Sequence, residues 1–124
     1  MKFEDPWVGE CELKVERRGD RVFIKILSKK LREEFDVLVR EFTVNVIPKG
    51  FRVVDCEVGF IEVSSSEVGI ALFAKLDEES LKKILRFVES FVEKPKVLVV
   101  GGRIPEEVFE ELNYKKSGFY YVKT

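Results

Sequence analysis

The sequence predicts an α+β fold: a mainly antiparallel, mixed sheet with two to three helices packed on one face. Three observations support this prediction. Apolar and polar residues alternate over several stretches, a helical period of apolar residues covers residues 77–94, and the expected elements follow the order ββ(α)βββαβαβ. The 124 residues show no repeat and no linker-like segment, so we expect a single α+β domain over residues 1–124.

The first expected elements are two strands, followed by a segment with two interpretations. Residues 10–16 and 22–26 alternate strictly on either side of a charged turn, which predicts a hairpin. Ser28 can cap a helix over residues 29–42, whereas β-branched residues after Glu41 favour a strand. The sequence therefore leaves open whether residues 29–47 are helix or strand.

The remaining elements alternate more regularly. Long apolar alternations predict strands over residues 51–63 and 68–76. Asp77 can cap the next helix, which is expected to end near Lys94 because Pro95 follows. Beyond it we expect a buried strand over residues 96–101, a short helix over residues 105–112 and a last strand over residues 114–124.

Histidine is absent from the chain. Because histidine exchanges protons near neutral pH and is the commonest metal ligand, its absence excludes Ser-His-Asp and Cys-His nucleophilic sites and HExxH zinc sites. The acidic pairs do not replace it, since they are adjacent in sequence and neighbours on a helix do not face each other. We therefore expect no catalytic residues, no metal site and no cofactor, and we interpret the protein as a binding domain rather than an enzyme.

A basic hairpin is the first candidate site. The net charge of the chain is −1, but residues 14–32 carry eight basic and two acidic side chains. Arginine and lysine can contact phosphates there, which makes an RNA- or DNA-binding module an alternative function. The other interpretation is a solvated hairpin, because Phe23 is the only aromatic residue available for base stacking in this range. The candidate residues are Arg17, Arg18, Arg21, Lys25, Lys29 and Lys30.

Gly101, Gly102 and Arg103 form a second candidate site, between an expected strand and an expected helix. The N-terminus of a helix offers free N–H groups to an anion. The segment lacks both the GxGxxG and the GxxxxGK[ST] spacing, so a plain strand–helix turn is the alternative interpretation.

Cys11 and Cys56 both fall in apolar alternations, which predicts two small buried side chains. Many lysines and glutamates, the absence of glutamine and only two asparagines are typical of thermophilic proteins. Because intracellular proteins of hyperthermophiles can contain disulfides, a Cys11–Cys56 bond is an alternative. The chain shows no signal peptide and no run of roughly 20 apolar residues, so we expect a cytoplasmic protein without a membrane partner.

The segment Phe109-Glu110-Glu111-Leu112-Asn113-Tyr114-Lys115-Lys116-Ser117-Gly118 resembles the end of GNAT-fold N-acetyltransferases, in which a short helix enters the final strands. The resemblance implies acetyl-CoA binding and acyl transfer. It also implies a glycine-containing loop near residues 75–80, where this chain has none, and a general-acid tyrosine that matches Phe109. A degenerate acyltransferase is therefore a further alternative.

The sequence best predicts a small, thermostable interaction domain that is not catalytic and associates with itself, as a homodimer, or with a protein partner. Long apolar alternation over residues 51–76 and an aromatic last strand offer a sheet surface or edge that a second subunit can cover. Nucleic acid is the alternative partner.

Overall fold

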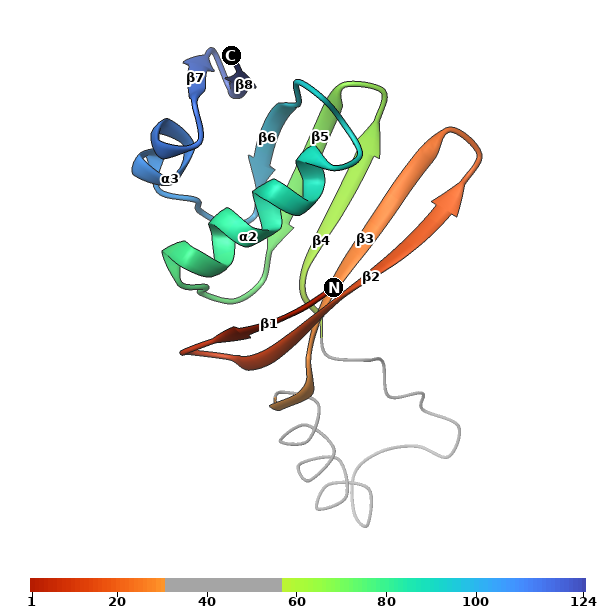
Figure 1. The fold of residues 1–124 in the computed structure, drawn as a ribbon, viewed down its shortest axis with the longest axis vertical. Helices are drawn as coiled ribbons and strands as arrows, with labels where there is room; N and C mark the ends of the chain where they lie inside the picture. The colour runs from red at the N-terminus through yellow and green to blue at the C-terminus, as the bar shows by residue number, and fades with distance from the viewer. Residues whose placement is uncertain (31–56) are drawn as a thin grey trace.

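The computed structural model describes residues 1–30 and 57–124, in which eight strands form one sheet (Figure 1). The strand order across this sheet is β1-β2-β3-β4-β5-β6-β8-β7. The strands are β1 (Lys2–Asp5), β2 (Gly9–Arg18), β3 (Arg21–Ser28), β4 (Glu57–Ser64), β5 (Glu67–Leu72), β6 (Lys96–Val100), β7 (Tyr114–Ser117) and β8 (Tyr120–Lys123). Every described pair is antiparallel except β5 with β6, so the predicted mixed, mainly antiparallel sheet is confirmed.

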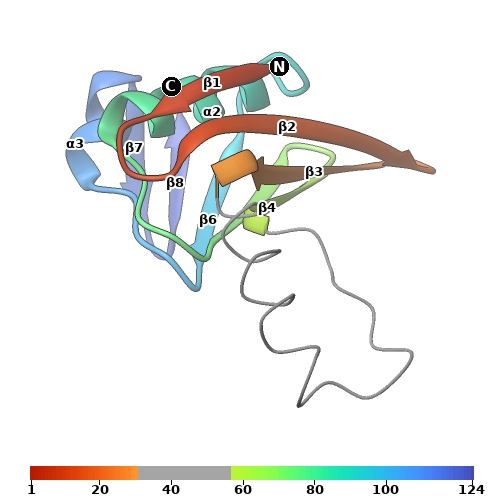
Figure 2. The same cartoon turned by 90° about the horizontal axis from the view of Figure 1, so that it is seen from below.

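Two helices are described, α2 (Glu78–Glu89) and α3 (Glu106–Glu111). Helix α2 connects the parallel strands β5 and β6, and α3 connects β6 to β7. Both helices lie on the same side of the sheet (Figure 2), and Lys82 of α2 forms an ion pair with Glu111 of α3. A third helix was expected from residue 29, where only Lys29 and Lys30 are described, and these two residues are helical.

The face of the sheet that carries the helices forms the core because apolar side chains alternate toward it along each strand. Neighbouring strands bring Leu13, Ile26 and Gly59 into one row, and Ile24, Ile61 and Ile70 into the next. The buried side of α2 covers these rows, and Phe109 of α3 stacks on Tyr121 of β8 with ring centres 3.9 Å apart. On the opposite face no described element covers the sheet.

Strand β1 was missed by the sequence analysis, and it is held by a buried carboxylate. One oxygen of Asp5 accepts hydrogen bonds from the N–H groups of Trp7 and Val8, at 2.7 and 2.9 Å. The other accepts from the N–H of Asp77 and the hydroxyl of Ser80, at 2.8 and 2.7 Å. Asp5 therefore fixes the β1–β2 turn to the beginning of α2.

Three expected boundaries were wrong. The last strand is two strands, β7 and β8, because Gly118 adopts a φ of +62° in the tight turn between them. Helix α2 ends at Glu89 rather than near Lys94, since the N–H groups after it bond carbonyls three residues back and tighten the last turn. Strand β5 ends at Leu72 rather than at residue 76, where the chain turns toward α2.

Two further expectations fall outside the described residues. They are the choice between helix and strand over residues 31–47 and the first part of the strand expected over residues 51–63. Among the residues that the structure does describe, no helix is long and apolar enough to cross a membrane.

Candidate ligand-binding site

The candidate site lies where the parallel strands β5 and β6 end. Pairing of these strands runs up to Ala71 and Val100, and the loops that follow them run side by side in Figure 2. One loop leads to α2 and the other to α3. In open sheets with parallel strands, ligands bind beyond the carboxyl ends of the strands. The topology thus points to this pair of loops.

A basic hollow of about 480 Å³ opens between the two loops. Its cationic side chains are Lys75 and Arg103, and no acidic side chain is among the described residues that line it. Its walls are otherwise apolar or backbone, contributed by Leu72, Phe73, Ala74, Leu76, Gly102 and Pro105. This combination suits a ligand that carries negative charge together with an apolar part.

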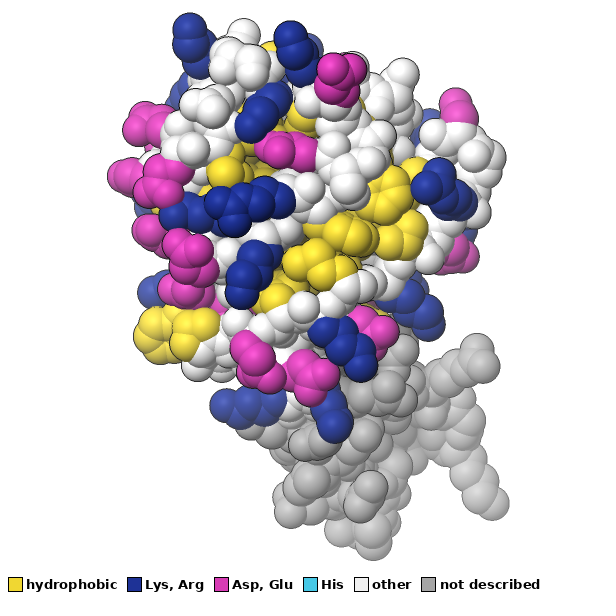
Figure 3. Space-filling view, in the orientation of Figure 1, with side chains coloured by type: hydrophobic (Ala, Val, Ile, Leu, Met, Phe, Trp, Pro, Cys, Tyr) yellow, Lys and Arg dark blue, Asp and Glu magenta, His cyan; other side chains and the backbone are white. Residues whose placement is uncertain are grey.

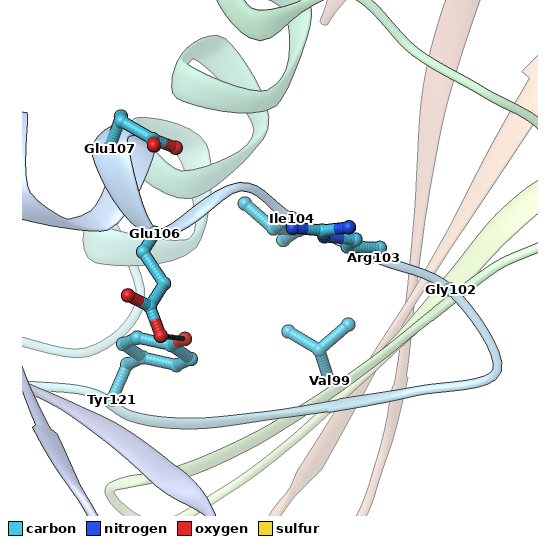
Figure 4. Close-up of a pocket in the computed structure, with 7 residues that line it drawn as sticks. All are labelled: Val99, Gly102, Arg103, Ile104, Glu106, Glu107 and Tyr121. Atoms are coloured by element: carbon cyan, nitrogen blue, oxygen red, sulfur yellow. Dashed lines mark hydrogen bonds between the residues drawn. The ribbon is translucent and has the colours of Figure 1, made fainter.

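An acidic hollow of about 290 Å³ adjoins it, on the helix side of the sheet (Figure 4). The Tyr121 hydroxyl donates a hydrogen bond of 3.4 Å to the Glu106 carboxylate, which also pairs with Lys116 at 3.2 Å. Partial burial and then the nearby Glu106 charge raise the pKa of Tyr121. The phenol therefore stays protonated and acts as a hydrogen-bond donor. Glu107 adds a second carboxylate to the lining.

Arg103 lines both hollows and lies between them. Its side chain is exposed, and within the described residues it forms neither an ion pair nor a hydrogen bond. An unpaired guanidinium can donate a fork of hydrogen bonds to a carboxylate or phosphate. The sequence analysis selected Arg103 as a candidate anion-binding residue, and this role stays a prediction.

The two glycines that precede Arg103 have backbone reasons to be glycine. Gly101 adopts a φ of +72°, which side-chain-bearing residues rarely adopt. A Cβ on Gly102 would lie 2.5 Å from the Cβ of Leu72, at the end of the neighbouring strand. The glycines therefore shape the loop and let it approach β5, and Gly102 alone of the two lines the hollows.

Two residues of the basic hollow were missed by the sequence analysis, namely Lys75 and Phe73. Both fell inside the strand expected over residues 68–76, whereas the structure places them in the loop between β5 and α2. A usable signal was present, since a strand–helix–strand order predicts a parallel pair whose following loops share one edge. Tyr121 and Glu106 lack such a signal, because only the insertion of β8 beside β6 places Tyr121 near the beginning of α3.

The basic hairpin does not form one cationic surface. Arg18 pairs with Glu16, Arg21 with Glu62, and Lys25 with Glu57, at 3.2, 3.0 and 3.5 Å. Arg17 points to the helix face, where its guanidinium lies 5.5 Å from the centre of the Phe91 ring. Lys29 and Lys30 are exposed beyond the other end of β3. On the face shown in Figure 3, Lys and Arg side chains are interspersed with Asp and Glu.

Cys11 is buried, as expected of a small core residue, and forms no disulfide with any described residue. Burial is the main cause that raises its pKa to about 11. Cys56 lies outside the described residues, so the Cys11–Cys56 disulfide stays a prediction. In the described part of the chain, no group of three or more potential ligands is placed to hold a metal ion.

The acetyltransferase resemblance implies a general-acid tyrosine and a glycine-containing loop before α2, and the structure has neither at the matching described positions. Phe109 is fully buried and carries no exchangeable proton. The loop before α2 contains no glycine, and the N–H of Asp77 already bonds the Asp5 carboxylate. Comparison with known proteins gives no family assignment: no protein family, no curated protein and no solved structure matches this chain.

Proposed function

We propose that this protein is a binding domain that takes up a small anionic molecule in the basic hollow. The observation that carries the proposal is the Arg103 guanidinium at the carboxyl ends of β5 and β6, which has no partner among the described residues, with Lys75 on the same hollow. The apolar walls favour a ligand that is not purely ionic. This function keeps the expectation of a non-catalytic binding domain and names its ligand class.

Thermal unfolding and calorimetry with inorganic pyrophosphate and with succinate test the proposal. A ligand at 100 times its Kd stabilises the native state by about 2.7 kcal/mol, which raises the Tm of a domain of this size by roughly 10 °C. Arg103→Ala removes a charge-assisted hydrogen bond and is expected to weaken binding about 10- to 100-fold. Arg86→Ala, which removes an exposed arginine of α2, is the matched control and should bind like the parent protein.

The proposal fails if neither anion binds, or if the Arg103→Ala and Arg86→Ala variants bind equally well. Affinity should also fall as salt is raised, because exposed charges are screened. An acyltransferase would instead be stabilised by acetyl-CoA and by no simple anion, so acetyl-CoA belongs in the same screen.

Self-association is the second candidate function, with a second copy of the chain as the partner. Phe60, Ala71 and Val100 form one row across β4, β5 and β6 on the sheet face opposite the helices. Val100 is 55% exposed there, while the ion pairs of the β3–β4 register flank the row, as at an interface with an apolar centre and a polar rim. Light scattering should show a dimer that Val100→Glu converts to a monomer. A wild-type monomer at about 100 µM, a concentration at which micromolar dimers assemble, would exclude this candidate.

A nucleic-acid-binding function has less support, because three of the hairpin cations already pair with carboxylates. It predicts affinity that falls steeply with salt and is lost when Arg17, Arg18 and Arg21 are replaced together by alanine.

A further inference from the structure

The basic hollow has an aromatic wall that anion binding alone does not require. Phe73 lines the hollow and is 62% exposed, although a large apolar ring is normally buried. Its backbone is held, because the Phe73 N–H donates a hydrogen bond of 2.7 Å to the carbonyl of Val58 in β4. The ring is therefore an exposed platform on a fixed stretch of chain.

A second exposed ring contacts one of the lining cations. Trp7 is 60% exposed, and the Lys75 ammonium is 5.3 Å from its ring centre. The Trp7 N–H and the Asp77 N–H both donate hydrogen bonds to the buried carboxylate of Asp5. These bonds fix the position of the β1–β2 turn relative to the loop before α2. One aromatic ring and two cations thus line the hollow, and a second ring contacts one of these cations.

We propose that the ligand of the basic hollow is a nucleoside phosphate, an assignment that rests on the proposed binding of an anion there. Its phosphates bond Arg103 and Lys75, and its base stacks on the Phe73 ring. Stacking on an aromatic side chain accepts every base, because each base has a flat π-face. Apart from the two cations assigned to the phosphates, no described side chain of the hollow carries a hydrogen-bonding group, so specificity among bases is expected to be low.

The dimensions favour a mononucleotide over a strand of nucleic acid. A hollow of about 480 Å³ lies within the size range of single small ligands. Of the described residues, two cations line it, and the neighbouring hollow presents Glu106 and Glu107, whose charges repel further phosphates. A polynucleotide track would need cations on that side as well.

Calorimetry with four ligands tests the assignment: ADP, inorganic pyrophosphate, adenosine and a short oligonucleotide. ADP is expected to bind about tenfold or more tightly than pyrophosphate, because stacking adds to the phosphate contacts. Phe73→Ala should bring ADP down to the pyrophosphate affinity and leave pyrophosphate itself unchanged. Phe119→Ala is the matched control, since Phe119 is an exposed phenylalanine in the β7–β8 turn and should have no effect on either ligand. Unchanged thermal unfolding without ligand confirms that each variant is folded.

The outcomes separate this assignment from the anion-binding function. Equal affinities for ADP and pyrophosphate, or an ADP preference that survives Phe73→Ala, overturn the nucleotide assignment while anion binding stands. If the oligonucleotide binds more tightly than ADP, the ligand is a nucleic acid strand rather than a mononucleotide, and this result also overturns the assignment. Binding of none of the four overturns both.

Discussion

Asp5→Asn is the substitution whose effect follows most directly from the structure. The Asp5 side chain is 2% exposed and accepts four hydrogen bonds, from three backbone N–H groups and the Ser80 hydroxyl. Asparagine has nearly the same shape but only one acceptor oxygen. If that oxygen serves the N–H groups of Trp7 and Val8, the amide NH2 group faces the N–H of Asp77, and two donors oppose each other.

The magnitude comes from the donors left without an acceptor. Each buried donor without a partner costs about 1–3 kcal/mol, and the variant leaves one or two in that state. Asp5→Asn is therefore expected to lower the free energy of unfolding by about 2–4 kcal/mol at pH 7, equivalent to roughly 10 °C in Tm. Ser80→Ala removes a single hydrogen bond to the same carboxylate and should cost about 1 kcal/mol.

The effect should also depend on pH. Burial raises the pKa of the Asp5 carboxyl. Hydrogen bonds from Asp77, Ser80, Val8 and Trp7 lower this pKa by a larger amount, so the folded-state pKa lies below its usual value of 3.8. A lowered pKa means that the ionised carboxylate stabilises the fold above about pH 4, and that this contribution is lost as the pH falls through the folded-state value. The asparagine variant has no such group.

Urea unfolding at pH 7, 4 and 3 measures the difference between parent and variant directly. The difference should be largest at pH 7 and shrink below pH 4. A variant within about 0.5 kcal/mol of the parent at pH 7, the range of an ordinary surface substitution, would show that the hydrogen bonds to Asp5 do not hold β1 to α2.

Two further predictions concern the loop glycine and the buried thiol. Gly102→Ala should lower the free energy of unfolding by about 1–3 kcal/mol, because its new Cβ meets the end of β5, whereas Gly69→Ala adds a Cβ with nothing within 4 Å and is the control in the same urea titration. In a Cys56→Ala background, Cys11 should resist a thiol reagent at pH 8 until the protein unfolds, because it is buried and its pKa is about 11; rapid modification of the native protein would contradict this.

The strands and helices with strong periodicity could be predicted from the sequence, whereas the four-residue strands β1, β7 and β8 were missed or merged. The alternation from Glu10 to Ile26 defines β2 and β3, and the helical period after Asp77 defines α2. Strand β1 has only four residues, too few for an alternation to stand out, and it depends on the distant partners of Asp5. The β7–β8 turn depends on the left-handed conformation of Gly118, and the presence of a glycine in the sequence does not by itself predict that conformation.

The candidate site could be predicted only in part. Arg103 was found because a glycine pair before a helix is a local pattern, whereas Lys75 and Phe73 become site residues only when β5 and β6 are parallel neighbours. The hairpin cations show what the sequence could not reveal, although their role in nucleic-acid binding stays a prediction. Arg21 and Lys25 look like a basic track in sequence, but their carboxylate partners Glu62 and Glu57 come from β4, far along the chain.

The parallel pairing of β5 with β6 has a consequence for any molecule that occupies the basic hollow. The paired residues Glu67 and Lys96 are separated in the chain by the whole crossover through α2, so neither loop contains a complete set of contacts. A ligand can bind both loops only when β5 and β6 are paired. By mass action, its binding therefore stabilises only the folded state in which this pairing has formed. Uptake therefore reports the integrity of the long-range tertiary structure, and no isolated fragment that lacks either strand can reproduce it.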